Sequence, residues 1–458
     1  MQPRQRRWSF RWRSLILLLS AMGMGFNPVK AQAGDLLNEH LPSYLKADVE
    51  FRYRLEDKNN FGFDKAKDDD DVHKLYRTRV SLGLTPIKQA TFFIQGQDAR
   101  VGHLSIGSKT KSTYSNLWDI RQLYAKYEEE VLVDAIGLNK IAFQGGRQEF
   151  AYGAERLIGG FNWSNIAQTF DGGRARFHFS VLHLQLDILT GDKVGFRSPQ
   201  ETEAGDLFDA STKDRMYAYY ATAKVFHETL IENYLIHRIT WKNISFGPNG
   251  SSEIDDYTFG GRIKNKLPYN FDYEIEGAGQ WGAFSKKAVR AAMAVGILGY
   301  TFDCPWQPRT AFEFDYASGG KPNGKTMNTF DNLYPTNHAK YGNMDFISLQ
   351  NMFDYHYQIS INPMKKLKLQ SDFHLLYLAT AKDSFYSAAR GVTRTTPAGL
   401  VGVSNHVGNE IDLSADYKLN AYLGFQGGYS HLFPGVYLKD TGTNNAADFL
   451  YFQTTVAF

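Results

Sequence analysis

The chain of 458 residues has one cysteine, Cys304, and after its first 33 residues it has no long uninterrupted apolar run. A single cysteine excludes an intramolecular disulfide framework and a metal cluster built on cysteines. A helical membrane protein is excluded too, because each span needs about 20 apolar residues. An excess of one charge is also missing, since 51 Lys and Arg stand against 48 Asp and Glu. A nucleic-acid-binding domain would be strongly basic. We therefore expect no nucleic-acid partner, no metal and no cofactor.

The first 33 residues have the pattern of a secretory signal peptide. Five arginines precede an apolar stretch, Leu15 to Phe26, and the small residues Ala31 and Ala33 follow it. The apolar stretch is shorter than the ~20 residues of a spanning helix, and an A-x-A site comes directly after it. We expect cleavage after Ala33, which leaves residues 34–458 as one mature domain; an uncleaved anchor helix is the alternative. The segment removes six basic residues and no acidic ones, so the mature chain holds 45 basic and 48 acidic groups.

What the sequence does contain is aromatic and glycine residues in a polar background. Aromatics make up 15% of the chain, there are 41 glycines, and the mean hydropathy is −0.40. Transmembrane β-barrels have this profile, because each strand shows one face to lipid and the other to water. A secreted soluble β-protein shares part of it.

Alternation of apolar and charged residues is the clearest pattern along the chain. From 47 to 56, Ala, Val, Phe, Tyr and Leu occupy the odd positions, and Asp, Glu, Arg, Arg and Glu the even ones. The same period of two returns at 76–84 and at 407–418. Successive side chains of a strand point to opposite faces, so these segments are predicted to be strands with one apolar and one polar face. Alternation alone also fits a soluble sandwich.

The end of the chain favours the membrane barrel over the sandwich. Phe458 is the last residue, and counting back by twos gives Val456, Thr454, Phe452 and Leu450. This resembles the barrel-assembly signal of outer-membrane proteins, in which a terminal aromatic residue closes an amphipathic strand. We therefore expect the barrel-assembly machinery to recognise the strand that ends in Phe458.

Turn residues divide the rest of the chain into about eighteen strands. They predict short connections near residues 86, 131, 180, 228, 268, 305, 363 and 420. Longer polar connections are predicted at 57–73, 103–117, 149–164, 193–212, 243–253, 284–288, 318–346, 380–405 and 433–447. The predicted fold is therefore all-β, an antiparallel up-and-down transmembrane barrel with short periplasmic turns and long extracellular loops. A barrel of this size encloses an aqueous channel, and it would sit in the outer membrane among lipid and lipopolysaccharide.

Arginines recur on the polar faces of the predicted strands. A guanidinium stays charged and binds carboxylates in a fork, so a ladder of them in the bore would attract uronate or other organic anions. In the alternative interpretation they only pair with acidic residues of the barrel wall, namely Glu50, Glu56, Glu410, Asp412 and Asp416. The pore-lining candidates from this alternation are Arg52, Arg54, Arg77, Arg79, Arg174, Arg176 and Arg262.

Three stretches resemble the alginate export family of outer-membrane barrels. The first is GRQEFAYGAERLIGGFNWSN from Gly146, continuing to TFDGGR at 169–174; the others are FDNLYPTNHAKYG at 330–342 and VGNEIDLSADY at 407–417. The resemblance implies a monomeric porin of eighteen strands whose arginine-lined bore selects an anionic polysaccharide or a similar organic acid. It also implies pore positions for Arg121 and Arg147, and the assignment of Arg100 rests on it as well.

Two other functions and one structural question remain open. No histidine is accompanied by a recognisable nucleophile motif, and neither G-x-S-x-G nor H-E-x-x-H occurs, so we predict no catalytic residue. An outer-membrane lipid hydrolase and a non-selective general porin are the alternatives. The Gly-rich connection from Ala151 to Asn162 can either fold into the lumen as a constriction or lie outside it.

Overall fold

The computed structural model describes residues 35–67, 69–102, 114–195, 210–226, 229–322 and 324–458. The predicted signal peptide and its cleavage site lie outside the described residues. In the described part of the chain, no helix is long and apolar enough to span a membrane. The α-helices of the described residues are short, α2 at Asp35–Asn38 and α4 at Val436–Thr441.

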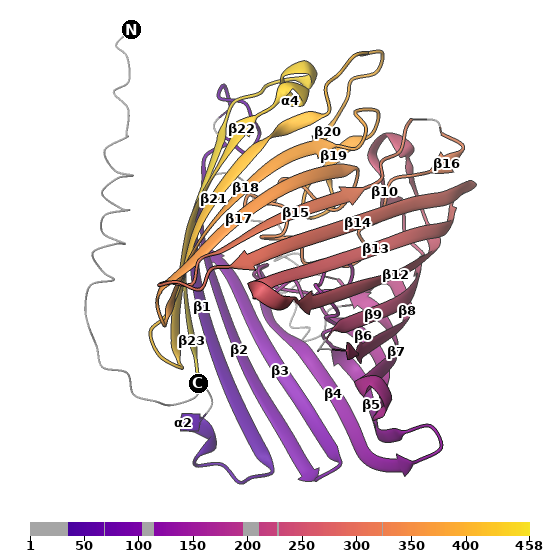
Figure 1. Ribbon diagram of the computed structural model, residues 1–458, viewed down its shortest axis with the longest axis vertical. Helices are drawn as coiled ribbons and strands as arrows, with labels where there is room; N and C mark the ends of the chain where they lie inside the picture. The colour runs from indigo at the N-terminus through magenta and orange to yellow at the C-terminus, as the bar shows by residue number, and fades with distance from the viewer. Residues whose placement is uncertain (1–34, 68, 103–113, 196–209, 227–228, 323) are drawn as a thin grey trace.

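Eighteen antiparallel strands of the described chain form one closed sheet (Figure 1). Each pairs with the next along the chain, and β1 also pairs with β23, which closes the barrel. The strands are β1 (Leu45–Asn59), β2 (Asp71–Ile87), β3 (Ala90–Gly102), β4 (Asn116–Val133), β5 (Leu138–Gln148), β6 (Phe170–Phe179), β7 (Leu184–Val194), β8 (Ser211–Lys224), β9 (Leu230–Thr240), β12 (Ile254–Lys266), β13 (Phe271–Phe284), β14 (Lys287–Thr301), β15 (Arg309–Ala317), β17 (Met352–Met364), β18 (Leu367–Leu378), β21 (His406–Lys418), β22 (Leu423–Pro434) and β23 (Ala447–Ala457).

A few short strands lie outside this regular order. The two-residue β16 (Thr326–Met327) runs parallel to the start of β14 and extends the sheet there. Two small ladders lie in the connections, β10 (Ile244–Ser245) with β11 (Ser251–Ser252) and β19 (Ser384–Tyr386) with β20 (Val392–Thr395).

The two ends of the chain meet where the barrel closes. The pairing of β1 with β23 runs from Glu50 opposite Ala457 to Asn59 opposite Asp448. Beyond the strand, the backbone N–H of Phe458 donates to the carbonyl of Val49 at 2.9 Å. The C-terminal segment that alternation identified is therefore the strand that completes the barrel.

Short and long connections alternate between the described strands, as the turn residues predicted. One predicted connection is wrong in length: the segment expected over 284–288 is a turn of two residues, Ser285 and Lys286. The strands continue because Phe284 and Val289 are buried in a small apolar cluster with Phe246. Burial outweighed the local turn signal at this position.

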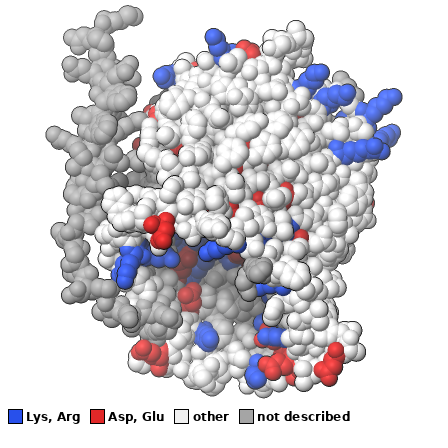
Figure 2. All heavy atoms as spheres, viewed as in Figure 1, with Lys and Arg blue, Asp and Glu red and all other residues white. Residues whose placement is uncertain are grey.

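The barrel wall has its apolar side outside and its polar side inside. On β1 and β2, the outward Phe51, Val80 and Leu82 are 41 to 45% exposed, whereas the inward Arg52 and Arg54 are 3% and 2% exposed. Figure 2 shows the same division from outside, as a broad band with few charged residues between charged residues above and below. This confirms the predicted fold class and the assignment of the polar face to the lumen.

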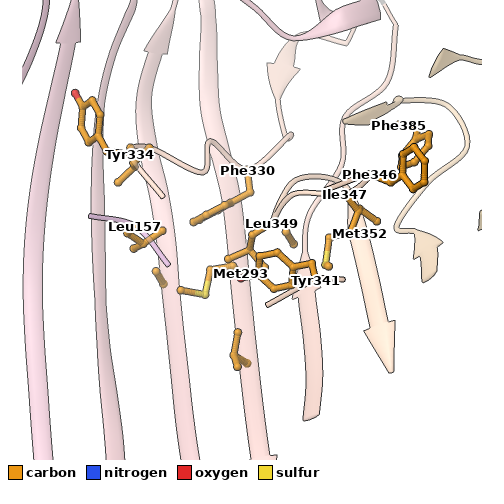
Figure 3. Packing of buried hydrophobic residues seen from close by; sticks show 14 of the residues in the cluster. Leu157, Met293, Phe330, Tyr334, Tyr341, Phe346, Ile347, Leu349, Met352 and Phe385 are labelled. Carbon is orange, nitrogen blue, oxygen red and sulfur yellow. The ribbon is translucent and has the colours of Figure 1, made fainter. Parts of the chain in front are cut away.

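The lumen is occupied by two connections. The first inward segment, residues 149–169, links β5 to β6, and the second inward segment, residues 328–351, links β16 to β17. Apolar side chains from both pack inside the barrel, among them Leu157, Phe330 and Tyr341, and Figure 3 shows them beside Met293 from the wall. The Gly-rich connection whose position the sequence left open thus folds into the lumen.

Candidate functional site

Four predicted arginines lie together on the inner wall made by β1 and β2. Arg52 is directly opposite Arg77 in the strand register, and Glu50 is opposite Arg79. Alternation places the four arginines on the inner face, where each is at most 8% exposed. We call Arg52, Arg54, Arg77 and Arg79 the arginine cradle.

The arginine cradle holds one turn of the first inward segment. Arg52 donates to the carbonyl oxygens of Asn162 at 2.7 Å and Ser164 at 3.0 Å. Arg77 donates to the same two carbonyls, at 3.1 and 3.3 Å. The guanidinium groups therefore bind neutral main-chain oxygens at the positions where a carboxylate solute would also fit.

Arg54 and Arg79, the other two members of the cradle, bind the same turn. Arg54 donates to the carbonyl of Trp163 at 2.7 Å, and its guanidinium lies 3.7 Å from the centre of the indole ring. Arg79 donates to the side-chain oxygen of Asn162 at 3.0 Å and to Gln97 at 2.7 Å. Among the described residues, Nη2 of Arg79 and Nε of Arg52 are buried with no hydrogen-bond acceptor. The cradle thus retains unused donors beside the turn.

Acidic residues of the barrel wall form ion pairs with two of the cradle arginines. Arg77 pairs with Glu50 and Arg54 with Glu56, both at 2.7 Å. For Arg52, the described residues offer carbonyl and amide oxygens but no carboxylate within ion-pair distance. The other acids considered as partners lie elsewhere: Glu410 and Asp412 bind the second inward segment, and Asp416 accepts a hydrogen bond from Gln426.

Arg121 extends the cradle onto β4. A bulge shifts the register there, since Gln95 pairs with Gln122 and Gly96 with Ile120. Arg121 donates to Gln95 at 2.7 Å and forms an ion pair with Glu149 at the start of the first inward segment. The structure therefore brings this resemblance-based candidate to the same segment that the cradle holds.

Three further candidates lie on the inner face at some distance along the wall. Arg174 donates to Gln144 at 2.9 Å, and Arg176 pairs with the buried Asp187 at 2.6 Å. Arg262 pairs with Glu232 at 2.6 Å and with Glu274 at 2.9 Å. Arg176 and Arg262 thus balance neighbouring wall acids, whereas Arg174 binds a neutral amide.

The side chains of two further candidates pair with acidic residues of the wall, although the main-chain carbonyl of Arg100 accepts a hydrogen bond from Asn165 of the first inward segment. Arg100 shares the outer face of β3 with Phe92 and Ile94; its side chain is 56% exposed and pairs with Asp98. The expectation that Arg100 lines the bore is therefore wrong, because the alternation of β3 turns Gln97 inward instead. Arg147 binds Asp171 on the neighbouring strand with two nitrogens, at 2.8 and 2.9 Å.

Two buried arginines that sequence reasoning missed hold the inward segments on the opposite wall. Arg156 of the first inward segment pairs with Glu274, Glu276 and Glu313, at 2.6 to 3.1 Å. Arg238 of β9 pairs with Asp214 at 2.7 Å and with Asp331 of the second inward segment. Arg156 is in the first family-like stretch, but a segment without strand alternation gave no way to predict its direction.

Charge is unevenly distributed in the layer that crosses the lumen. Burial disfavours the charge of Arg156, but Tyr341, Glu276 and Glu313 offset this and raise its pKa. Burial, reinforced by Arg156, lowers the pKa of Lys340 in the second inward segment. Acidic side chains thus dominate this side, whereas guanidinium groups dominate the cradle side.

The two inward segments form one layer from the cradle to the acidic wall. Ile158 and Tyr334 form a parallel bridge, and the N–H of Gly159 donates to the carbonyl of Tyr334 at 2.8 Å. Trp163 and His338 stack with ring centres 3.7 Å apart. The second inward segment also contacts β21, since the N–H of Met344 donates to Glu410 at 2.9 Å. The first and second family-like stretches therefore contact each other, and residues directly after the second contact the third.

Comparison with known proteins agrees with the barrel fold. The model of a family described as alginate export matches residues 43–452. Among solved structures, Pseudomonas aeruginosa OccK2 (OpdF) in complex with glucuronate has a TM-score of 0.58 at 10% identity, over 90% of this chain and 98% of that one.

Two more structures from the same organism are similar. OpdO has a TM-score of 0.56 at 9% identity over 92% of this chain and 99% of its own. The outer membrane protein OprD has a TM-score of 0.55 at 11% identity over 94% and 97%. At these identities the likeness shows the fold alone. No curated protein sequence matches the chain.

Proposed function

Since this chain belongs to the alginate export family and is an outer-membrane channel rather than an enzyme, we propose that it conducts carboxylate-bearing solutes along the arginine cradle. The solute class we propose is uronate or another organic acid. An acidic polysaccharide would use the same wall, but its passage requires a larger displacement of the two inward segments.

One observation carries the proposal: the cradle is occupied by neutral oxygens and not by carboxylates alone. A guanidinium can bind a carboxylate through two parallel hydrogen bonds and a charge pair, whereas a main-chain carbonyl offers it one neutral oxygen. A solute carboxylate can therefore compete for Arg52 and Arg77 against the carbonyls of Asn162 and Ser164. The unused Nη2 donor of Arg79 offers it a first contact.

The known neighbours are consistent with this solute class. The solved OccK2 structure contains glucuronate, which shows that a barrel with a similar fold binds a uronate. In this chain, an anion-selective bore is the alternative to a general porin without charge preference. The two differ in one measurable quantity, the ratio of anion to cation permeability.

The test is electrical recording of the mature protein in planar bilayers. We expect a reversal potential that indicates anion selectivity in a KCl gradient, and a current that falls when glucuronate is added. Arg79→Gln should reduce both effects, because it removes a buried inward charge whose hydrogen-bond acceptors among the described residues are Gln97 and Asn162. Arg100→Gln is the matched control, since this arginine is on the outer face of β3.

Either of two results would count against the proposal. Cation selectivity of the unaltered protein would exclude an anion channel. An equal loss of selectivity in the Arg79 and Arg100 variants would assign the effect to total charge and not to the bore.

The proposal includes the route to the membrane and the assembly state. We expect export through the signal peptide at 1–33, with Gly34 as the first residue of the protein isolated from the outer membrane, which N-terminal sequencing would reveal. We also expect a monomer, which native mass spectrometry of the detergent-solubilised barrel would measure.

A further inference from the structure

An aromatic row crosses the outer face of the barrel near the ends that carry the long connections. Tyr217, His237, Tyr257 and Trp281 are consecutive register partners on β8, β9, β12 and β13. Their ring centres are 6.0, 4.1 and 5.8 Å apart, and neighbouring planes differ by 28°, 8° and 12°. A general aromatic girdle does not require four stacked rings in one line.

A cation continues this line on the next strand. Arg290 of β14 is the register partner of Trp281, and its side chain is exposed. From Tyr217 to Arg290 the line spans four strand spacings of about 4.8 Å, or roughly 19 Å. This width accommodates several acyl chains side by side, and it exceeds what a two-chain phospholipid needs.

More cations gather around Arg290. Figure 2 shows Lys and Arg at the upper right edge, over the ends of β13, β14 and β16. The basic cluster comprises Lys286, Lys287 and Arg290 at the start of β14, and Lys325, which precedes the register partner of Ala288 on β16; all but Lys287 are exposed.

Fewer acidic than basic groups lie around this cluster. Glu253 lies beside the turn of β13 and β14, since its carbonyl accepts the N–H of Ser285. Asp255 is bound to His237 at 2.8 Å. Lys287 donates to the carbonyl of Asn249 at 2.9 Å and so is already engaged. Positive charge therefore remains in excess at this corner.

An apolar hollow lies under the other end of the aromatic row. It has a volume of about 500 Å³ and is open on the outer face of β6 to β9. Tyr217 and His237 form its upper edge, and Ile188, Leu235 and Gly173 are among the residues that line it. A hollow on a lipid-facing wall, away from the bore, fits a hydrocarbon chain.

We propose that this surface binds the lipid A part of lipopolysaccharide, with a phosphate on Arg290, Lys286 and Lys325 and acyl chains on the aromatic row and in the hollow. The charge of this surface and its depth in the membrane both support lipid A as the ligand. The basic cluster complements a phosphorylated headgroup, and a row near the long connections lies at the outer leaflet. The site is separate from the arginine cradle and does not depend on what the bore conducts.

The test uses native mass spectrometry of the full mature protein in detergent, with added hexa-acylated, bis-phosphorylated lipid A. The combined variant K286Q/R290Q/K325Q should retain this lipid about tenfold less than the unaltered protein. The matched control K67Q/K382Q/K439Q removes three exposed lysines from other long connections and should retain it fully. Heat-modifiable gel migration would verify that both variants are folded.

Each remaining outcome bears on the proposal. Weaker retention of the same lipid without its phosphates supports it, as does quenching of Trp281 fluorescence by brominated acyl chains that disappears in Trp281→Phe. Equal retention by both triple variants, equal binding of phosphatidylglycerol, or a dimer in place of the lipid would overturn it. Unchanged anion selectivity in K286Q/R290Q/K325Q would show that its loss of lipid A binding is separate from the function of the bore.

Discussion

Trp163→Ala should release the turn that the arginine cradle holds. The Trp163 ring has Arg54 3.7 Å from its centre on one side and stacks on His338 at 3.7 Å. The ring of Tyr451 meets it edge-on at 5.1 Å. The substitution removes all three contacts but leaves every hydrogen bond from the cradle to a main-chain carbonyl in place.

The size of the effect follows from these contacts. A desolvated cation–π contact contributes about 2 kcal/mol, and each aromatic pair about 0.5 to 1.5 kcal/mol. Since neighbouring contacts are not additive, we take about 3 kcal/mol for the set. This corresponds to an increase of roughly a hundredfold in the equilibrium constant for release of the turn.

Hydrogen exchange measures this release directly. We expect the amides of residues 149–169 to exchange faster in Trp163→Ala, while the barrel strands keep their protection. Single-channel records should show more frequent excursions to a higher conductance. Trp306→Ala is the control, because this tryptophan is 58% exposed on a connection of the opposite end. Unchanged protection of 149–169 in Trp163→Ala would refute the role given to the turn.

Two further substitutions and one deletion test the wall and its closure. Arg238→Met leaves the buried Asp214 without its ion-pair partner and leaves Asp331 with Arg390 alone, so it should lower the free energy of unfolding by about 3 to 5 kcal/mol in urea titrations; Arg215→Met, whose arginine is 39% exposed, should cost about 1 kcal/mol or less. Gly146→Ala should impair folding into the heat-modifiable barrel, because φ is +129° there and a Cβ would meet a carbonyl oxygen at 2.3 Å; Gly145→Ala meets nothing within 4 Å and should fold normally. Deletion of Phe458 should reduce the amount of assembled protein in outer-membrane fractions, and normal levels would contradict its predicted recognition by the assembly machinery.

The wall of the barrel could be predicted from the sequence because strand geometry fixes the direction of every second side chain. That rule placed Arg52, Arg54, Arg77 and Arg79 on one face, and the structure confirms their inward direction. It gives no clear direction for Arg100, whose assignment to the bore rests on the family resemblance, and this side chain lies outside.

The contents of the lumen could not be predicted in the same way. The inward segments have no period of two, and the direction of Arg156 depends on carboxylates from strands more than a hundred residues away. The family resemblance identified the stretches that form the layer, but it did not indicate that Gly159 and Tyr334 would bond to each other inside the barrel. Such long-range contacts leave no local pattern in a single sequence.

The layer across the lumen is attached to the wall by different interactions at its two sides. This difference determines which attachment a solute can displace. At the acidic wall, Arg156 makes ion pairs with three buried carboxylates, and removing one partner of such a pair costs several kcal/mol. At the cradle, the turn at 162–164 is held through neutral oxygens, which a carboxylate can replace at the same guanidinium donors. In the proposed function, the acidic wall repels an anionic solute and the cradle attracts it. An anionic solute is therefore expected to pass between the turn and the cradle. Meanwhile the ion pairs of Arg156 keep the neighbouring part of the first inward segment in place.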